Sequence, residues 1–307
     1  MFDIVGKRLW YIVISGVVIL AGIVSLATFG LKLGIEFESG SMMTVSFEED
    51  VTEEALKNEL ASLDYGNAIV QSFEEEGSYL IRLPELSNEA KDDLVDGLAA
   101  GLGDIKESSF DKNVSPMVAA ETGRNTFWAV FVAAIGILLY VTWAFHRMPN
   151  PFRYGTCAII ALVHDALVAL GTFSLLGGLL GWEIDLMFVT GVLAVVGYSV
   201  NDTVVIFDRI RENLARYTRS DFRTVVNNSL VETLSRSMNT SLTSLFVVPA
   251  LQLFVGESIQ NFAVVLIIGV ITGTYSSLCV APQLLVAWEK GELARFFRWL
   301  PRRGGRQ

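Results

Sequence analysis

Cysteine, histidine and charged residues are all scarce in this chain of 307 residues. It has two cysteines and two histidines, and 18% of its residues are charged, against about 25% in an ordinary soluble domain. Cys157 and Cys279 both lie in apolar runs without CxxC spacing, which excludes a disulfide framework and a zinc site. GxxxxGK[ST] is missing, as is GxGxxG behind a strand. We therefore expect no metal, no cofactor, no nucleic-acid partner and no enzymatic activity.

Apolar residues make up 52% of the chain and gather in runs longer than a soluble helix needs. Hydrocarbon about 30 Å thick takes roughly 20 residues in a helix, so these runs predict a polytopic α-helical membrane protein. Six transmembrane helices are predicted, at residues 9–31, 126–145, 155–179, 184–207, 234–255 and 262–288. Pro249 and Pro282 fall inside the last two, where neighbouring helices can satisfy the carbonyls that proline frees.

Lysine and arginine set the predicted orientation, because connections rich in these residues stay in the cytoplasm. The start of the chain, the second and fourth connections and the tail are basic, whereas the third and fifth connections are short and acidic. Six spans then place both termini in the cytoplasm and the protein in the cell membrane. Residues 1–33 are predicted to hold an uncleaved anchor, because their apolar stretch exceeds the roughly 7 to 15 residues of a signal peptide.

Residues 34–124 form the one large polar segment, with 6 basic and 21 acidic residues and a net charge of −15. On the predicted topology this is an external domain. Residues 125–288 are then a five-helix transmembrane bundle with a cytoplasmic amphipathic segment at 208–233, and residues 289–307 are a basic cytoplasmic tail. The arginines of the tail predict contact with anionic lipid.

The external segment shows the pattern of a small α+β domain. Alternating apolar residues predict strands at 43–47, 68–73, 78–83 and 104–110, with a turn at Glu76-Gly77. Helices are predicted at 52–63, with Thr52 as the cap, and at 88–102. The order β-α-β-β-α-β is the split βαβ of ferredoxin-like domains. Since the segment holds no histidine and no cysteine, we expect binding or mechanical work from it.

Few ionisable groups lie inside the predicted spans, where each costs about 2.5 to 3.5 kcal/mol to insert. His164 and Asp165 lie near the middle of the third span, Asp202 in the cytoplasmic third of the fourth, and Arg236 at the cytoplasmic start of the fifth. Desolvation favours a neutral carboxyl and a nearby cation favours a carboxylate, so helix motion between Asp202 and Arg236 would switch a proton on and off. A static ion pair that fixes helix packing is the alternative.

Two further patterns concern helix packing. Beyond Asp208 an amphipathic helix with Ile210, Leu214 and Tyr217 on one side is predicted to lie along the cytoplasmic interface. Gly269 and Gly273 form a GxxxG in the sixth span, as Gly177 and Gly181 do at the end of the third, which predicts close helix packing.

Five motifs resemble those of the SecF family of protein-export membrane subunits. They are LGIEFESGS from Leu33, VSPMVAAET from Val114, VHD from Val163, GYSVNDTVVIFDRIREN from Gly197 and SRSMNTSLTS from Ser235. The resemblance covers almost the whole chain except the basic tail. The family usually has an aspartate and a paired glycine where this chain has Glu36 and Ser39, which puts in doubt a special backbone conformation at Ser39.

The resemblance implies half of an RND-superfamily transporter that pairs with SecD and uses the proton-motive force to move secreted polypeptides through the SecYEG translocon, with SecA in bacteria and YajC-type auxiliary subunits. Asp202 would carry the proton and Arg236 would modulate it, with Asn201 and Thr203 as hydrogen-bonding neighbours and His164 and Asp165 as weaker candidates. A structural or assembly subunit without its own relay is the alternative. A small-molecule exporter would need larger external domains.

Overall fold

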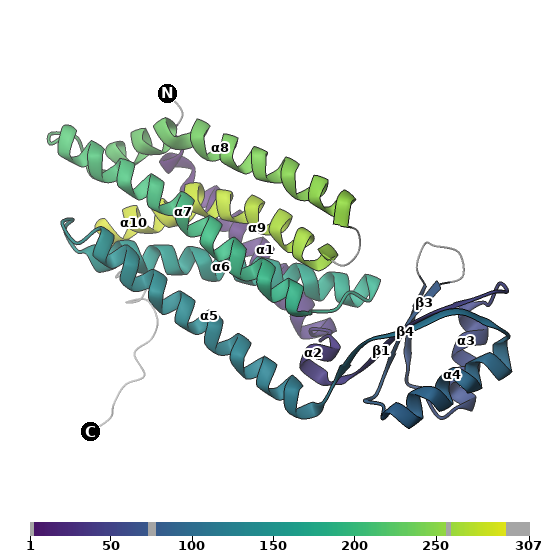
Figure 1. Ribbon diagram of the computed structural model, residues 1–307. Coiled ribbons are helices and arrows are strands. Elements are labelled where there is room, and N and C mark those ends of the chain that lie inside the picture. Colours follow the sequence, from purple (N-terminus) through teal and green to yellow (C-terminus); the bar gives the residue numbers. More distant parts are fainter. Residues whose placement is uncertain (1–2, 73–77, 256–258, 293–307) are drawn as a thin grey trace, which may run out of the picture. The chain divides into compact units, whose positions relative to one another are not determined.

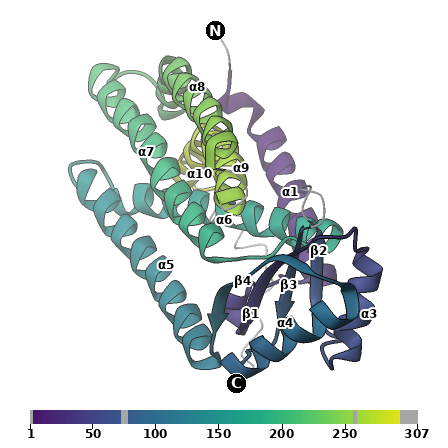
Figure 2. The same ribbon diagram turned by 45° about the vertical axis from the view of Figure 1, so that its right-hand side comes forward.

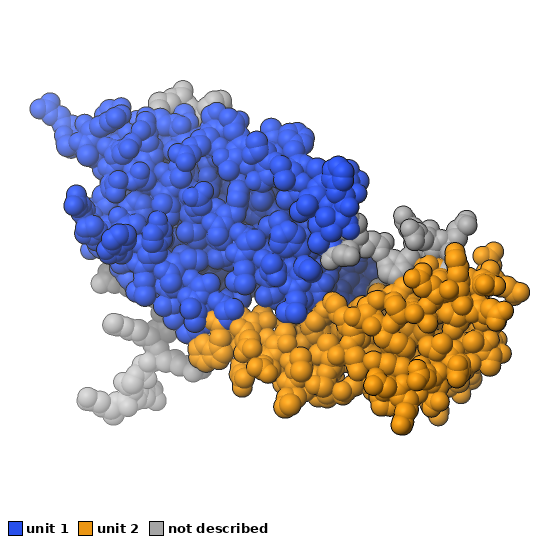
Figure 3. Space-filling model, in the orientation of Figure 1, with its two compact units in different colours: residues 1–32, 129–307 blue, residues 33–128 orange. Residues whose placement is uncertain are grey.

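The computed structural model describes residues 3–72, 78–255 and 259–292, which divide into two compact units. Residues 1–32 and 129–307 form the helical unit, and residues 33–128 form the sheet unit (Figure 3). The predicted turn at Glu76-Gly77 and the tail arginines from Arg295 onward lie outside the described residues.

Among the described residues, six helical stretches are long and apolar enough to cross a membrane, which confirms the six spans predicted from the sequence. Their elements are α1 (Arg8–Phe29), preceded by the 3-10 turn Val5–Lys7, α5 (Pro116–Ala144), α6 (Pro151–Leu180), α7 (Leu186–Arg216), α8 (Phe222–Val255), α9 (Gln260–Cys279) and α10 (Ala281–Glu289). α8 lies beside α7 and α9 (Figure 1 and Figure 2). Half of the most apolar window of α6 is buried, against 6% in α1 and α5 and 11% in α8. The last three therefore present apolar side chains outward.

Small residues bring the central helices together. A Cβ on Gly269 of α9 would lie 2.0 Å from Val195 Cγ2 of α7, and one on Gly273 would lie 3.1 Å from Ser199 Cβ. The GxxxG of the sixth span therefore packs α9 closely against α7, as expected. Gly171 of α6 faces α1 in the same way, because its Cβ would meet a backbone carbon of Gly22 at 2.5 Å.

The first residues of α1, α6 and α8 and the last of α10 lie at one end of the helical unit. Three ion pairs join these ends: Arg8 with Glu292 (2.7 Å), Arg153 with Glu289 (2.6 Å) and Arg223 with Asp3 (3.1 Å). This arrangement agrees with an even number of spans between the two ends of the described chain.

The sixth predicted span, 262–288, lies within one membrane-capable stretch, Gln260–Glu289, which confirms it. Its helix is interrupted once, at Val280, where α9 ends and α10 begins with Pro282 in its first turn, because proline lacks the N–H that would continue the α9 ladder. The segment 208–233 covers the end of α7, which runs to Arg216, and the start of α8 at Phe222. Its apolar residues join one buried cluster across the two helices, including Ile210, Leu214, Val226 and Leu230.

The sheet unit has four antiparallel strands in the order β2-β3-β1-β4. These are β1 (Gly40–Phe47), β2 (Ile69–Ser72), β3 (Ser78–Leu83) and β4 (Ile105–Val114). The helices α3 (Glu53–Ser62) and α4 (Asn88–Leu102) cover one face of the sheet (Figure 2), and Thr52 caps α3 by accepting from the Ala55 N–H at 3.2 Å. Because β3 separates β1 from β2, the fold is the predicted ferredoxin-like split βαβ.

The chain enters β1 through a short helix, α2 (Ile35–Glu38), and a strained residue. Ser39 has φ 70° and ψ 162°, and Gly40 has φ 141°. The special conformation that the sequence left in doubt at Ser39 is therefore present, although serine replaces glycine there. Glu36 of α2 pairs with Lys112 of β4 at 2.6 Å, which fastens this entry to the edge of the sheet.

Candidate functional site

Asp202 lies in the interior of the helical unit, midway along α7. The residue is 8% exposed, and its Oδ1 accepts a hydrogen bond of 2.6 Å from Ser237 Oγ on α8. Its Oδ2 is buried and has no hydrogen-bond partner among the described residues. A carboxylate with one satisfied and one unsatisfied oxygen is costly to hold ionised in an apolar interior. This environment suits a group that can exchange a proton.

Arg236 precedes Ser237 on α8, but its side chain is exposed and forms no ion pair within the described ranges. The static Asp202–Arg236 ion pair considered above is therefore not formed in this structure. Because Asp202 and Arg236 come from different helices, their separation depends on how α7 and α8 pack.

Arg236 lines a groove of about 510 Å³ between the end of α5, α7 and α8. Charged side chains of both signs surround the groove, and most of them are paired. Arg209 contacts both Glu212 and Glu232 at 2.6 Å, and Arg211 contacts Asp208 at 2.6 Å. The groove thus places a polar surface next to the helix face that carries Ser237.

Asn201 and Thr203 do not hydrogen-bond the carboxylate between them, contrary to what the resemblance implies. The Asn201 side chain is exposed, and the Thr203 hydroxyl is bonded to Ser277 of α9 at 2.9 Å. Successive residues of a helix point about 100° apart, so the two neighbours of Asp202 face other surroundings.

A row of hydroxyl groups continues from Asp202 into the helical unit, and the sequence analysis missed it. Ser241 donates to the Ser237 carbonyl at 2.7 Å, and the Ser241 hydroxyl is also bonded to those of Thr274 and, at 2.9 Å, Tyr198. The signal was available in the spacing, because Ser237 and Ser241 are four residues apart on one face of a predicted apolar helix.

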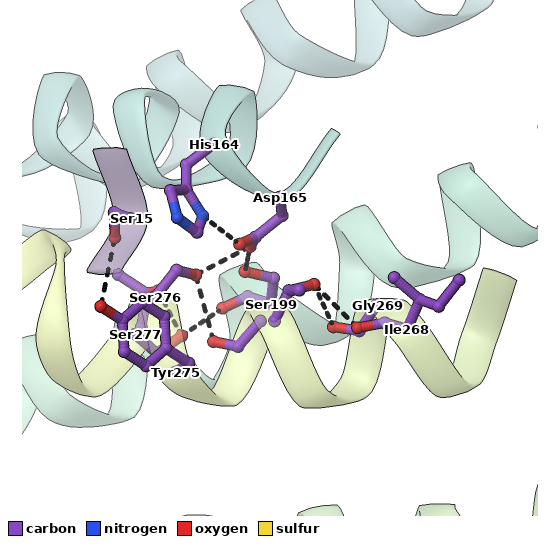
Figure 4. Close-up of polar contacts among 12 residues, drawn as sticks. Ser15, His164, Asp165, Ser199, Ile268, Gly269, Tyr275, Ser276 and Ser277 are labelled. Atoms are coloured by element: carbon purple, nitrogen blue, oxygen red, sulfur yellow. Dashed lines mark hydrogen bonds and ion pairs between the residues drawn. The ribbon is translucent and has the colours of Figure 1, made fainter. Parts of the chain in front are cut away.

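His164 and Asp165 form a second buried polar cluster, in the middle of α6 (Figure 4). They are 6% and 2% exposed, and His164 Nδ1 lies 3.0 Å from Asp165 Oδ1. Asp165 Oδ2 accepts from Ser199 of α7 at 2.7 Å and from Ser276 of α9 at 2.8 Å. Although the two residues are adjacent on the helix, the imidazole turns toward the carboxylate.

Comparisons with known proteins agree on one family. A family model described as "Protein export membrane protein SecD/SecF, C-terminal" matches residues 97–291, and one described as "SecD/SecF GG Motif" matches residues 24–51. A protein translocase subunit SecF of Thermobaculum terrenum is 42% identical, with 97% of each chain covered.

Longer relatives contain a region that is similar to this chain. The protein translocase subunit SecDF of Bacillus subtilis is 34% identical, over 96% of this chain and 39% of its own length. The crystal structure of SecDF, a translocon-associated membrane protein from Thermus thermophilus, matches with a TM-score of 0.81 at 30% identity, covering 94% of this chain and 39% of that one. This chain therefore corresponds to about two fifths of a SecDF polypeptide.

Proposed function

The chain belongs to the SecD/SecF family of protein-export membrane proteins, and from this we propose that it couples the proton-motive force to protein export together with SecD. Its relatives are named as protein translocase subunits, which supports an accessory transport role in Sec-dependent export. It is a multi-pass membrane protein.

The observation that carries the proposal is the half-satisfied carboxyl of Asp202. One oxygen accepts from Ser237 and the other has no partner in the described part of the chain. When the carboxyl is ionised, the unpartnered oxygen favours movement toward a cation or water. When it is protonated, the O–H needs an acceptor instead. The two states therefore favour different positions of α7 relative to α8.

Arg236 supplies the cation that distinguishes these states. It is unpaired among the described residues and stands beside the groove on the same helix as Ser237. Approach of Arg236 would stabilise the carboxylate, and its withdrawal would stabilise the neutral acid. One charge crossing a membrane at 100 mV releases about 2.3 kcal/mol, which changes the ratio of two conformations by about 50-fold.

SecD is the proposed source of the missing half of the pathway. Transporters of this class are built from two similar halves with the pathway near the middle of the membrane, and the described part of this chain has one set of six membrane-capable helices. The apolar outer surfaces of α1, α5 and α8 need lipid or another protein to cover them. We propose that the SecYEG translocon, SecA, YajC-type subunits and the secreted polypeptide are further partners.

The proposed topology places the sheet unit outside the cell membrane and both termini in the cytoplasm. The basic residues support it, because the joined ends of α1, α6, α8 and α10 are the ends that carry the lysine and arginine clusters. In this orientation the sheet unit meets the secreted polypeptide as it leaves the channel.

The alternative is a structural or assembly subunit that has no relay of its own. It requires Asp202 to fix the packing of α7 against α8 through the Ser237 hydrogen bond alone. Asp202→Asn separates the two functions. It removes the charge but keeps the shape of the side chain, and its amide oxygen can still accept a hydrogen bond from Ser237.

The test compares Asp202→Asn with a matched control, Asp208→Asn, which removes a carboxylate six residues along the same helix. Translocation of a secreted reporter is measured in vesicles that contain the complete translocase, with and without a proton ionophore, after copurification with SecD has been checked. We expect Asp202→Asn to bind SecD and to lose the ionophore-sensitive part of the rate, and Asp208→Asn to keep it.

Gradient-dependent export by an assembled Asp202→Asn complex would refute the relay. Failure of that variant to bind SecD would favour the structural subunit. Arg236→Lys keeps the charge but loses the planar guanidinium, so a partial loss of the gradient-dependent rate would show that geometry matters beside charge.

A further inference from the structure

The cluster around His164 and Asp165 holds the other buried carboxyl among the described residues of the helical unit, and the proposed coupling through Asp202 does not involve it. Its members come from three helices: His164 and Asp165 from α6, Ser199 from α7, and Tyr275 and Ser276 from α9. Tyr275 is in turn bonded to α1. The Tyr275 hydroxyl donates to the Tyr11 carbonyl at 2.8 Å and lies 3.2 Å from Ser15 Oγ (Figure 4).

Asp165 lacks a permanent cation. Within the described ranges its partners are two serine hydroxyls and the imidazole of His164. The other titratable group packed on the cluster is the Tyr275 phenol, which in turn lies against the ring of Tyr11. Phenols ionise only at about pH 10. Ser199 is the α7 side chain that bonds to the cluster. Asp202, which is also on α7, is bonded to Ser237 of α8 instead.

The charge of the cluster therefore depends on one proton. With a neutral imidazole and an ionised carboxyl, the cluster carries a full negative charge in an apolar interior, which is strongly disfavoured. One added proton makes the cluster neutral overall, either as an imidazolium–carboxylate pair or as a neutral imidazole beside a carboxylic acid. Both neutral forms keep a hydrogen bond between Nδ1 and Oδ1.

The opposing cost lies at the other ring nitrogen. His164 Nε2 is buried and has no hydrogen-bond partner in the described structure, so a proton placed there leaves a buried donor unsatisfied unless water enters. The ring packs against Tyr275, with centroids 6.0 Å apart. The buried negative charge favours uptake of the proton, and the unsatisfied Nε2–H opposes it. Such a balance is expected for a site that exchanges its proton.

We propose that His164 and Asp165 form a second proton-binding site of the chain, separate from Asp202, that holds one exchangeable proton. The proton enters at Nε2 or at the carboxyl and leaves to water by the same route, with no other bond made or broken. Occupancy changes the net charge of the pair. Where the proton rests on the carboxyl, it also weakens the bonds from Ser199 and Ser276, since bonds to an ionised acceptor are about twice as strong as neutral ones.

This site would govern how firmly α7 is held to α6 and α9. Ser199 precedes Asp202 by three residues, so both lie on nearly the same side of α7. α7 is thus bonded to Asp165 of α6 through Ser199 and to Ser237 of α8 through Asp202. The role in export rests on the proposed function, whereas the proton site itself does not.

The chain offers a direct test, because it contains two histidines and the other, His146, is exposed. The full chain, with isotope-labelled histidine, is purified with SecD, and the imidazole nitrogens are followed by NMR between about pH 5 and pH 9. His146 serves as the reference, and His164→Gln identifies the signal of position 164. We expect a protonation step at His164 that Asp165→Asn abolishes or weakens by at least about tenfold in proton affinity.

Removal of the two serine hydroxyls gives a second measurement if Asp165→Asn does not fold. Ser199→Ala combined with Ser276→Ala is expected to change the protonation step, whereas the control Ser174→Ala is not, because Ser174 of α6 bonds Ser25 and the Gly30 carbonyl outside the cluster. A His164 that keeps one tautomer across the range, unaffected by these variants, would overturn the proposal.

The result of the His164 measurement does not depend on whether Asp202 acts as a relay. Asp202→Asn is expected to leave the His164 step in place. If Asp202→Asn keeps gradient-dependent export while His164 still titrates, the proposed function fails and the second proton site stands. If His164 does not titrate while Asp202→Asn abolishes the gradient response, the reverse holds.

Discussion

Replacement of Ser39 by glycine should stabilise the sheet unit. Ser39 combines φ 70° with ψ 162°, a region that is essentially open to glycine alone and costs other residues about 1–3 kcal/mol. The serine hydroxyl makes no hydrogen bond among the described residues, so nothing is lost with it. Glycine gives back about 0.5–1 kcal/mol through its greater freedom in the unfolded chain. The net gain for Ser39→Gly is therefore about 0.5–2 kcal/mol.

Hydrogen exchange followed by mass spectrometry measures this gain in the full chain, on peptides that cover β1 and β3. A gain of this size slows exchange of their amides by about 2-fold to 30-fold when exchange occurs through opening of the sheet. Ser46→Gly is the matched control, since Ser46 lies in β1 with φ outside the left-handed region. It should speed exchange instead, through a loss of about 0.5–1 kcal/mol. Faster exchange in Ser39→Gly, or no change, would refute the assignment of strain to this residue.

Two further outcomes follow from the structure. Gly269→Ala should destabilise the helical unit by about 1–3 kcal/mol, because the added Cβ would lie 2.0 Å from Val195 Cγ2. Val195→Ala added to it should recover part of the loss in thermal unfolding in detergent, and simple addition of two losses would contradict the close contact. Hydrogen bonding from the Thr224 side chain holds the pKa of Asp221, in the connection before α8, below its ordinary value. A carboxyl with a lowered folded pKa adds stability above its unfolded pKa and loses it as the pH falls through the folded pKa. The Tm difference between the wild type and Asp221→Ala should therefore shrink below about pH 4, and a constant difference would contradict this.

Local pattern was sufficient for most elements. The helix predicted at 88–102 and the strand at 78–83 match α4 and β3, because capping residues and the alternation of apolar side chains are properties of neighbouring residues. The ends of elements that depend on distant contacts were harder to predict from local pattern. β4 continues to Val114, four residues beyond the predicted end, because it pairs with the start of β1 at Gly40, and the sequence of β4 alone carries no sign of that partner.

The candidate site divides in the same way. Asp202 and Asp165 could be selected from the sequence, since a carboxyl in an apolar run is unusual wherever the helix packs. Their partners could not. Ser237 lies 35 residues from Asp202 along the chain, and Ser199 and Ser276 lie 34 and 111 residues from Asp165. Such contacts depend on the rotation and crossing of whole helices.

The sequence by itself determined the six spans, the separate acidic α+β segment and the presence of two carboxyls within lipid depth, because hydrophobicity and charge sum locally along the chain. Only the tertiary structure decided that Arg236 stands apart from Asp202, that the VHD motif fastens α7 and α9 to α6, and that Ser39 adopts a conformation typical of glycine. Each of these depends on which surfaces meet when the helices and strands pack, and that choice minimises unsatisfied buried polar groups over the whole fold.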